Sequence, residues 1–180
     1  MARSFANGPG RRAVIWTQGC SLGCHGCFNP ETHSREGGQI ADVAHLGQMV
    51  LELSDELEGL TISGGEPLQQ MLPLLELLEL IRQQSRLSII LFSGFEFAEI
   101  QRFPKAAQLL GCLDVLIAGR YDQRRRFAAG LRGSTNKTIH LLSPRYSAAD
   151  LEAVPAAEAV ISPDGALWFS GIDPLDWKST

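Results

Sequence analysis

Short apolar runs alternate with longer stretches of helical periodicity along most of the chain, and this alternation limits the fold more than any other feature. Strands that are separated by helices predict right-handed crossovers and a mainly parallel sheet, so we expect an α/β fold. We expect strands at residues 12–17, 60–63, 88–92, 114–118 and 137–142, helices at 40–57, 72–84 and 97–110 with a break near Pro104, and two short strands around a Pro-Asp-Gly turn within 159–169.

The length and composition fit one globular domain. With 180 residues, 44% of them hydrophobic and 20% charged, the chain has enough apolar material for a single core, so we expect one domain over residues 1–180. The formal net charge of -4 gives no general attraction for nucleic acid. No apolar stretch approaches the roughly 18 residues of a membrane span, and the first ten residues lack the apolar run of a signal peptide. We therefore expect a cytoplasmic protein without a membrane or nucleic-acid partner.

Three of the four cysteines stand close together in a loop that follows the first expected strand. Cys20, Cys24 and Cys27 have the spacing C-x3-C-x2-C, and three thiolates are one fewer than a closed tetrahedral zinc site or a cubane cluster requires. If the metal is a 4Fe-4S cluster, one iron is left open for an exogenous ligand. The loop also contains residues that accept the positive φ angles needed to wrap a cluster, namely Gly19, Gly23 and Gly26.

A structural zinc site is the other interpretation of the cysteine loop. His25 or His33 would then supply the fourth ligand, although His25 lies between two of the cysteines, where its side chain would struggle to reach the same metal. Cys112 stands alone in an apolar segment, so we expect it to be a small buried hydrophobic residue.

A glycine-rich turn with a carboxylate follows the second expected strand. Gly64, Gly65, Glu66 and Pro67 would make a sharp turn, with Glu66 directed to the same rim as the cysteine loop, because both follow a parallel strand. A carboxylate there is suited to accept hydrogen bonds from an ammonium group. The alternative is an ordinary strand-to-helix turn, in which Pro67 begins the helix and Glu66 lies near its positive end.

Together these motifs resemble the radical S-adenosylmethionine (SAM) superfamily, and more narrowly the short activating proteins of anaerobic ribonucleotide reductases. The similarity runs in order from about residue 7 to residue 140. It implies a partial (β/α) TIM-like barrel of about five or six mainly parallel strands with a C-terminal hairpin, and residues 144–180 as a family-variable extension. The segments that carry it are Asn7-Gly8-Pro9-Gly10, residues 19–29, residues 63–68, Ser93-Gly94-Phe95, Gly119-Arg120-Tyr121 and residues 132–136.

The resemblance implies a role for each matching residue. The three clustered cysteines would bind a 4Fe-4S cluster, and SAM would bind the open iron through its amino and carboxylate groups. The glycine-rich turn would hold the SAM amino group, and Phe28 would lie near the adenine. The other residues expected to bind the cofactor are Asn29, Ser93, Arg132, Ser134 and Asn136, of which the last three would contact the SAM carboxylate or ribose.

The resemblance also implies a reaction. A reduced flavodoxin or ferredoxin would pass one electron to the cluster, and SAM would be cleaved to a 5'-deoxyadenosyl radical that removes hydrogen from a glycine. Because this chain has no evident glycyl-radical segment, the glycine would belong to a large partner enzyme. No protein acid or base is required, which agrees with the lack of a convincing Ser-His-Asp or paired-carboxylate arrangement. The arginines between residues 120 and 132 form either a solvated basic loop or a docking site for an acidic partner or the flavodoxin.

Two other functions are compatible with the sequence. One is a stand-alone radical SAM enzyme that modifies a peptide or small metabolite, with the C-terminal extension shaping its own pocket. The other is an adaptor or electron carrier without enzymatic activity, which holds zinc or an iron-sulfur cluster. The glycine-rich turn argues against a simple carrier, and the absence of further cysteine clusters argues against enzymes with auxiliary clusters.

Overall fold

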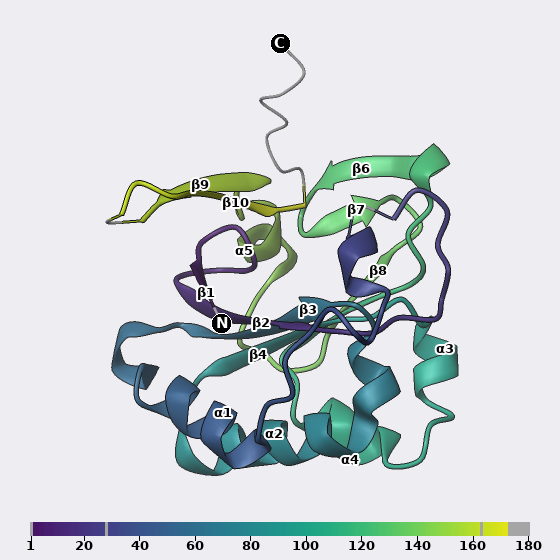
Figure 1. Ribbon diagram of the computed structural model, residues 1–180. Coiled ribbons are helices and arrows are strands. Elements are labelled where there is room, and N and C mark those ends of the chain that lie inside the picture. Colours follow the sequence, from purple (N-terminus) through teal and green to yellow (C-terminus); the bar gives the residue numbers. More distant parts are fainter. Residues whose placement is uncertain (1, 28, 163, 173–180) are drawn as a thin grey trace.

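A six-stranded sheet forms the centre of the protein in the computed structural model, which describes residues 2–27, 29–162 and 164–172 (Figure 1). In sheet order the strands are β1 (Ala2–Ser4), β2 (Arg12–Thr17), β3 (Gly59–Gly64), β4 (Ser88–Phe92), β5 (Val115–Ala118) and β8 (Thr138–Leu141). The four strands from β2 to β5 pair in parallel, whereas β1 and β8 are antiparallel edge strands.

The mainly parallel α/β fold is confirmed, but the barrel is not. Among the described residues no pairing joins β1 to β8, so the sheet is open. β8 runs antiparallel to β5 because the connection between them contains the hairpin of β6 (Arg126–Ala129) and β7 (Arg132–Ser134) where a parallel pair would need a crossover helix. The strands expected at residues 12–17 and 88–92 have the expected bounds.

Four helices lie on one side of the sheet (Figure 1): α1 (Val43–Leu51), α2 (Met71–Gln84), α3 (Phe97–Ile100) and α4 (Ala106–Gly111). The helix expected at residues 40–57 is shorter, because Asp42 caps its start by accepting a hydrogen bond from His45 N at 2.8 Å, and a separate 3-10 turn follows at Ser54–Glu56. The break near Pro104 divides α3 from α4, as expected. None of the described helices is long and apolar enough to cross a membrane.

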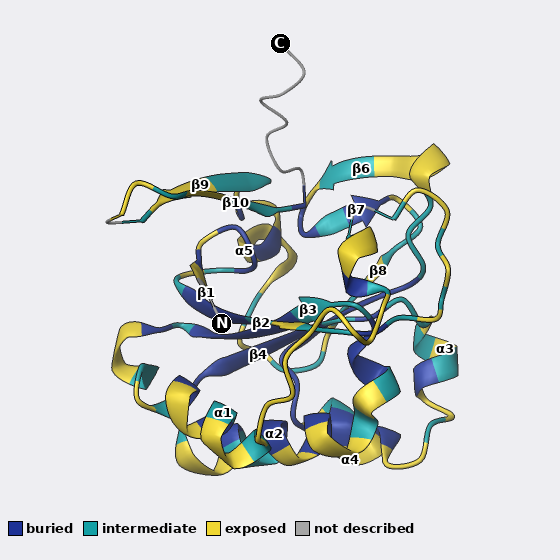
Figure 2. Ribbon diagram, in the orientation of Figure 1, coloured by how far each residue is buried: buried dark blue, intermediate teal, exposed yellow. Residues whose placement is uncertain are grey.

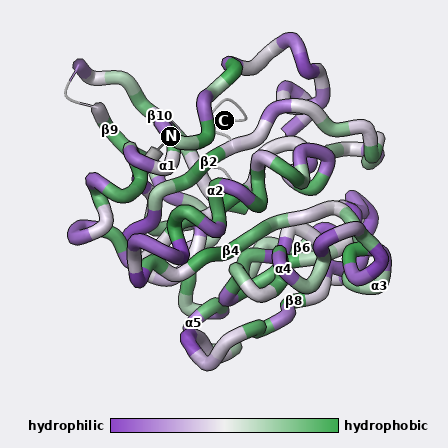
Figure 3. The backbone as a smooth tube through the Cα atoms, turned by 90° about the horizontal axis from the view of Figure 1, so that it is seen from below, coloured by the Kyte–Doolittle hydropathy of each residue, from purple (hydrophilic) through white to green (hydrophobic). Residues whose placement is uncertain are grey.

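Apolar side chains pack on both faces of the parallel strands. In β4, Ile89 and Leu91 belong to the larger core cluster, which also contains residues of α1, α2 and α4, whereas Ile90 belongs to a smaller cluster. This alternation follows from strand geometry, and both faces are covered, as is usual for parallel strands. Figure 2 shows these strands as largely buried, and Figure 3 shows the apolar character of β4 from the side of the helices.

The other side of the sheet carries α5 (Ala148–Glu152), the β6–β7 hairpin, the cysteine loop, and a second hairpin of β9 (Ala157–Ile161) and β10 (Leu167–Gly171) (Figure 1). This C-terminal hairpin was expected; Pro163, part of the expected Pro-Asp-Gly turn, lies outside the described residues. Its attachment to the N-terminal segment includes a hydrogen bond of 2.7 Å from Asn7 Nδ2 to Ser170 Oγ.

A buried arginine lies at the edge of the sheet where the parallel strands begin. The Arg12 side chain is fully buried and donates hydrogen bonds to Thr61 Oγ1 at 2.7 Å, Ser88 Oγ at 2.9 Å and Tyr146 OH at 3.2 Å. It also donates to the carbonyl oxygens of Leu60 and Ser88. Because this end is filled by a polar network, the carboxyl ends of the strands are left to form the site.

Candidate functional site

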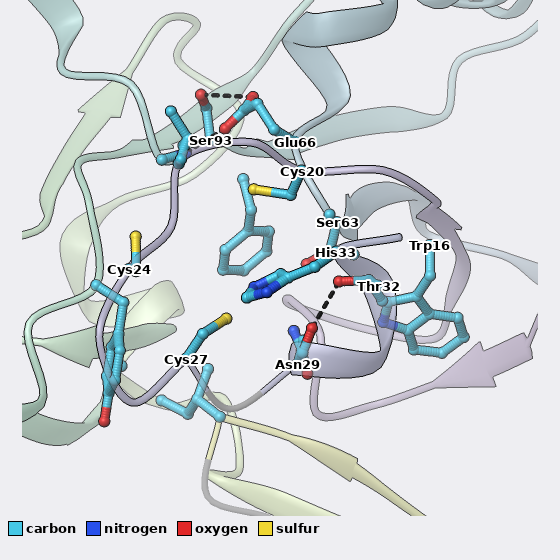
Figure 4. Close-up of a pocket in the computed structure, with 18 of the residues that line it drawn as sticks. Trp16, Cys20, Cys24, Cys27, Asn29, Thr32, His33, Ser63, Glu66 and Ser93 are labelled. Carbon is cyan, nitrogen blue, oxygen red and sulfur yellow. Dashed lines mark hydrogen bonds between the residues drawn. The ribbon is translucent and has the colours of Figure 1, made fainter. Parts of the chain in front are cut away.

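The connections that leave the carboxyl ends of β2, β3 and β4 enclose a pocket of about 480 Å³, called here the cysteine pocket (Figure 4). Figure 4 shows the three cysteine side chains standing around this pocket, with the His33 ring pointing into it. The cysteine loop and the glycine-rich turn therefore share one rim, as expected. Both sets of residues line the pocket, namely Cys20, Cys24, Cys27, Gly64, Gly65 and Glu66.

Backbone hydrogen bonds close the cysteine loop on itself. Gly19 N donates to Thr32 O at 2.8 Å and Cys20 N donates to His33 O at 3.0 Å, so the 3-10 turn at Pro30–Thr32 returns the chain to the start of the loop. The loop glycines have the positive φ angles that were expected of them: 102° at Gly19, 63° at Gly23 and 70° at Gly26.

All three thiols of the loop are partly exposed in the pocket. Burial raises the pKa of the Cys20 and Cys27 thiols, and backbone hydrogen bonds at Leu22 and Asn29 lower it in part. Among the described residues, no group of three His, Cys, Asp or Glu side chains is close enough to hold a single metal ion. His33 lines this pocket, whereas His25 is exposed and lines a separate one. Cys112 is 8% exposed and lies in the main core, as expected.

The glycine-rich turn is held against the start of the cysteine loop. Gly65 N donates to Thr17 O at 2.8 Å, and Glu66 N donates to Gly19 O at 3.0 Å. A Cβ atom at Gly65 would collide with the carbonyl oxygen of Gly19, and a Cβ atom at Gly64, whose φ is +100°, would collide with the backbone of Thr17. Both glycines are therefore required by the close approach of two backbone segments, which the sequence pattern alone did not reveal.

Glu66 is fully buried, and three donors hold its carboxylate. Ser93 Oγ and Leu68 N donate to Oε1 at 2.9 and 3.0 Å, and Gly94 N donates to Oε2 at 2.6 Å. Burial raises the pKa of this carboxyl, and the hydrogen bonds lower it in part. Since each carboxylate oxygen accepts two hydrogen bonds, Oε2 retains room for one more donor.

The local geometry of the turn also agrees with the ordinary strand-to-helix interpretation. Pro67 begins a 3-10 turn at Pro67–Gln70, and the Glu66 side chain caps it through Leu68 N. Glu66 is thus both the cap of a short helix and the link between the ends of β3 and β4.

The other six residues expected to bind the cofactor have three different outcomes. Asn29 and Ser93 line the cysteine pocket, and Phe28 lies outside the described residues. The structure does not bring the remaining three into the described lining. Ser134 Oγ accepts a hydrogen bond from Asp122 N, Asn136 Nδ2 donates to Arg120 O at 2.8 Å, and the Arg132 guanidinium lies over the ring of Phe127 at 5.0 Å.

Their neighbour Lys137 does line the pocket, and sequence reasoning missed it. It directly precedes β8, and Thr138 at the start of β8 pairs with Ala118 at the end of β5. An antiparallel strand begins at the edge where its parallel neighbours end, so this lysine reaches the site. The direction of β8 was the missing information.

The C-terminal hairpin also contributes to the pocket. Phe169, Ser170 and Gly171 of β10 line it, together with Ile172. From the sequence, a contribution of the C-terminal extension to the pocket was expected only for a stand-alone enzyme.

Acidic side chains pair with several arginines of the basic loop. Arg120 forms a salt bridge of 2.9 Å with Glu99 and lies over the Phe95 ring, while Arg124 pairs with Asp122 at 3.2 Å. The loop is therefore partly neutralised by its own surroundings. Such exposed pairs contribute about 0–1 kcal/mol each, so they leave the docking hypothesis open.

Comparisons with known proteins identify the family to which this chain belongs. A model described as a 4Fe-4S single cluster domain matches residues 6–140, which contain the cysteine loop and the glycine-rich turn. Curated relatives named anaerobic ribonucleoside-triphosphate reductase-activating protein are similar over most of the chain. One from Enterobacteria phage T4 is 31% identical over 139 residues, which are 75% of this chain and 86% of the relative. The chain belongs to this family of activating proteins.

Two further relatives with the same name extend the comparison. The activating protein of Haemophilus influenzae is 31% identical over 143 residues, or 74% of this chain and 90% of the relative. That of Escherichia coli K12 is 30% identical over 145 residues, or 77% of this chain and 93% of the relative. In this chain the matched 4Fe-4S single cluster domain ends inside β8, so α5 and the C-terminal hairpin lie outside it.

Proposed function

We propose that this chain activates an anaerobic ribonucleotide reductase by forming a glycyl radical on it, with a 4Fe-4S cluster and SAM as cofactors. One observation carries the proposal: in a chain of the activating-protein family, the three loop cysteines and the glycine-rich turn line a single pocket. Membership of the activating-protein family supports a ribonucleotide reductase as the partner, and the pocket supports the position of the cofactor site.

The donor set of the pocket fits an iron-sulfur cluster. Cys20, Cys24 and Cys27 are free thiols at one rim, and thiolates are the protein ligands that such clusters use. With three protein ligands, one iron would remain for SAM. When bound, such a cluster would supply one electron for the cleavage of SAM to methionine and a 5'-deoxyadenosyl radical.

The glycine-rich turn fits the SAM amino group. Glu66 and the backbone of Gly64 and Gly65 line the pocket, and carboxylate and carbonyl oxygens are the acceptors that an ammonium group uses. We propose that Asn29 and Ser93, which also line the pocket, contact SAM. Phe28, Arg132, Ser134 and Asn136 stay candidates on the basis of the resemblance.

Apolar side chains give the pocket a second task, which is to exclude water and competing hydrogen donors. Leu22, Leu131 and Phe169 line it from three different segments of the chain. A reactive radical is useful only where its intended hydrogen is the nearest one, so an apolar lining favours the correct reaction.

The partner and the electron donor are part of the proposal. The hydrogen would come from a glycine of the reductase, and the electron from a reduced flavodoxin or ferredoxin. Free thiols persist in a reducing compartment, so we propose a cytoplasmic location.

Anaerobic reconstitution with iron and sulfide, followed by dithionite and SAM, tests the proposal. We expect about four irons per chain and formation of 5'-deoxyadenosine. Cys24→Ala should lose the cluster, and the matched control Cys112→Ala, which removes a core cysteine outside the loop, should keep it. Glu66→Ala should keep the cluster and weaken SAM binding. Zinc binding without 5'-deoxyadenosine in the wild type would remove the enzyme function and favour an adaptor.

A stand-alone radical SAM enzyme is the second candidate, because β10 contributes to the pocket from outside the matched domain. In this case residues 144–180, which we propose are a variable extension of a single domain, would shape a pocket for a small substrate. A glycyl-radical signal on added reductase, seen by electron paramagnetic resonance, would support the activating function. Production of 5'-deoxyadenosine without that signal would favour the second candidate.

A further inference from the structure

Lys137 brings a positive charge into the cysteine pocket. Its Nζ donates a hydrogen bond of 2.6 Å to the carbonyl oxygen of Gly119, directly after β5. Burial lowers the pKa of this ammonium group, while Cys24, Glu66 and Cys27 act in the opposite direction. The ammonium therefore lies within electrostatic reach of two of the cysteines and the buried carboxylate.

No described carboxylate lies within ion-pair distance of the Lys137 ammonium. The nearby arginines differ, since Arg120 pairs with Glu99 and Arg124 with Asp122. Gly119 O is a neutral acceptor, so two of the three N–H donors of the lysine stay available. Lys137 is partly buried, and Glu66 acts on it from beyond ion-pair distance, so a negatively charged group bound in the pocket would complete the surroundings of its ammonium.

A thiolate-bound iron-sulfur cluster is a group of this kind. Its reduction potential depends on its net charge and on nearby charges and hydrogen bonds. Reduction adds one negative charge, so a fixed positive charge nearby attracts the reduced cluster more strongly than the oxidised one. Lys137 lines the same pocket as Cys24 and Cys27, and its hydrogen bond to Gly119 O fixes its ammonium there, which meets this requirement.

We propose that Lys137 is a fixed counter-charge that raises the reduction potential of the cluster. The lysine acts through the cluster and is neither a ligand nor an acid in the reaction. This inference rests on the proposed function, since it needs a cluster at the three cysteines. The SAM carboxylate is a second anion that this ammonium could bind, so the experiment separates the two.

The test is a redox titration of the reconstituted protein without SAM, followed by electron paramagnetic resonance. Lys137→Gln should make one-electron reduction about tenfold less favourable, which is about 59 mV for a one-electron couple. Lys137→Arg keeps the charge and should stay close to the wild type. Lys105→Gln removes the same charge from an exposed position outside the pocket and should change nothing, which controls for net charge. Lys137→Met, which keeps the apolar stem, is titrated in parallel in case Lys137→Gln does not load iron.

The outcomes are distinct. A lower potential in Lys137→Gln or Lys137→Met, with Lys137→Arg and Lys105→Gln unchanged, supports the inference. An unchanged potential together with weaker SAM binding assigns the lysine to the SAM carboxylate and overturns it. If the wild type binds no cluster at all, the proposed function fails first, and this inference falls with it.

Discussion

Ser93 Oγ donates a hydrogen bond of 2.9 Å to the fully buried carboxylate of Glu66, and this contact joins the ends of β4 and β3. The same hydroxyl accepts a hydrogen bond from Phe95 N at 3.0 Å. One side chain thus orders both the carboxylate at the site and the turn that follows β4.

Ser93→Ala should destabilise the protein, because it leaves a buried carboxylate and a backbone N–H each short of one partner. We expect the free energy of unfolding to fall by about 1–3 kcal/mol, measured by urea denaturation. Ser63→Ala is the control: Ser63 lines the same pocket and is not one of the donors to Glu66. Equal urea midpoints for the two variants would contradict the role of the hydroxyl.

Gly65→Ala should displace the cysteine loop, since the new methyl group would overlap Gly19 O and approach Thr32 O at 3.0 Å. Overpacking of this kind costs about 1–3 kcal/mol, so we expect lower stability and less iron bound after reconstitution. Gly111→Ala is the control, because a Cβ there meets nothing within 4 Å. Wild-type iron content and stability in Gly65→Ala would show that the two segments do not need this contact.

Asp114 should make stability depend on pH in the acid range. Burial raises the pKa of its carboxyl, but hydrogen bonds from Ser143 Oγ, Ile89 N and the Arg82 guanidinium outweigh this and hold the pKa below its ordinary value of 3.8. A carboxylate with a lowered pKa stabilises the fold above its ordinary pKa, and this contribution is lost as the pH falls through the folded value.

Asp114→Asn should therefore lower stability at neutral pH and flatten its decline below about pH 4. The ion pair with Arg82 is partly exposed, so we expect a loss of about 1–3 kcal/mol at neutral pH, which is the usual cost of leaving hydrogen-bonding groups without a charged partner. Urea unfolding at a series of pH values measures both effects, with the exposed Asp55→Asn as control. If the free energy of unfolding of Asp114→Asn fell at low pH as steeply as that of the wild type, other groups would be responsible for the fall.

Arg12→Lys should lower the stability of the protein although it keeps the positive charge. A lysine has three donors on one nitrogen and cannot replace the fork that reaches Thr61, Ser88 and Leu60. We expect a loss of about 2–4 kcal/mol in thermal or urea unfolding, with normal cluster loading in the folded fraction, because the network lies at the far end of the sheet. Arg11→Lys alters a partly exposed ion pair with Glu56 and should cost less than about 1 kcal/mol. Similar losses of stability in Arg12→Lys and Arg11→Lys would argue against a stabilising role of the Arg12 hydrogen-bond network.

The central sheet could be predicted from the sequence because its strands are short, apolar and separated by helical stretches. β2 and β4 have the expected bounds, and their residues are mostly buried. The cysteine loop and the glycine-rich turn could be assigned to one rim because each follows a parallel strand. β6, β7 and α5 could not be predicted, since each has only three to five residues and no clear periodicity.

Details of the site depended on contacts between residues far apart in the sequence. The burial of Glu66 could not be foreseen, because two of its donors, Ser93 and Gly94, come from the turn after the neighbouring strand β4. Lys137 was missed because no local pattern gave the direction of β8. The close approach that requires Gly65 involves the loop after β2, which sequence periodicity does not describe.

The contact between Gly65 and Gly19 has a thermodynamic consequence. Because there is no space between the two backbones, a rearrangement of the loop that carries the metal ligands shifts the turn proposed for SAM. Binding linkage is reciprocal, so the factor by which a bound cluster improves SAM affinity equals the factor by which SAM improves retention of the cluster. On the proposed function, a molecule that loses its cluster would lose affinity for SAM by that same factor.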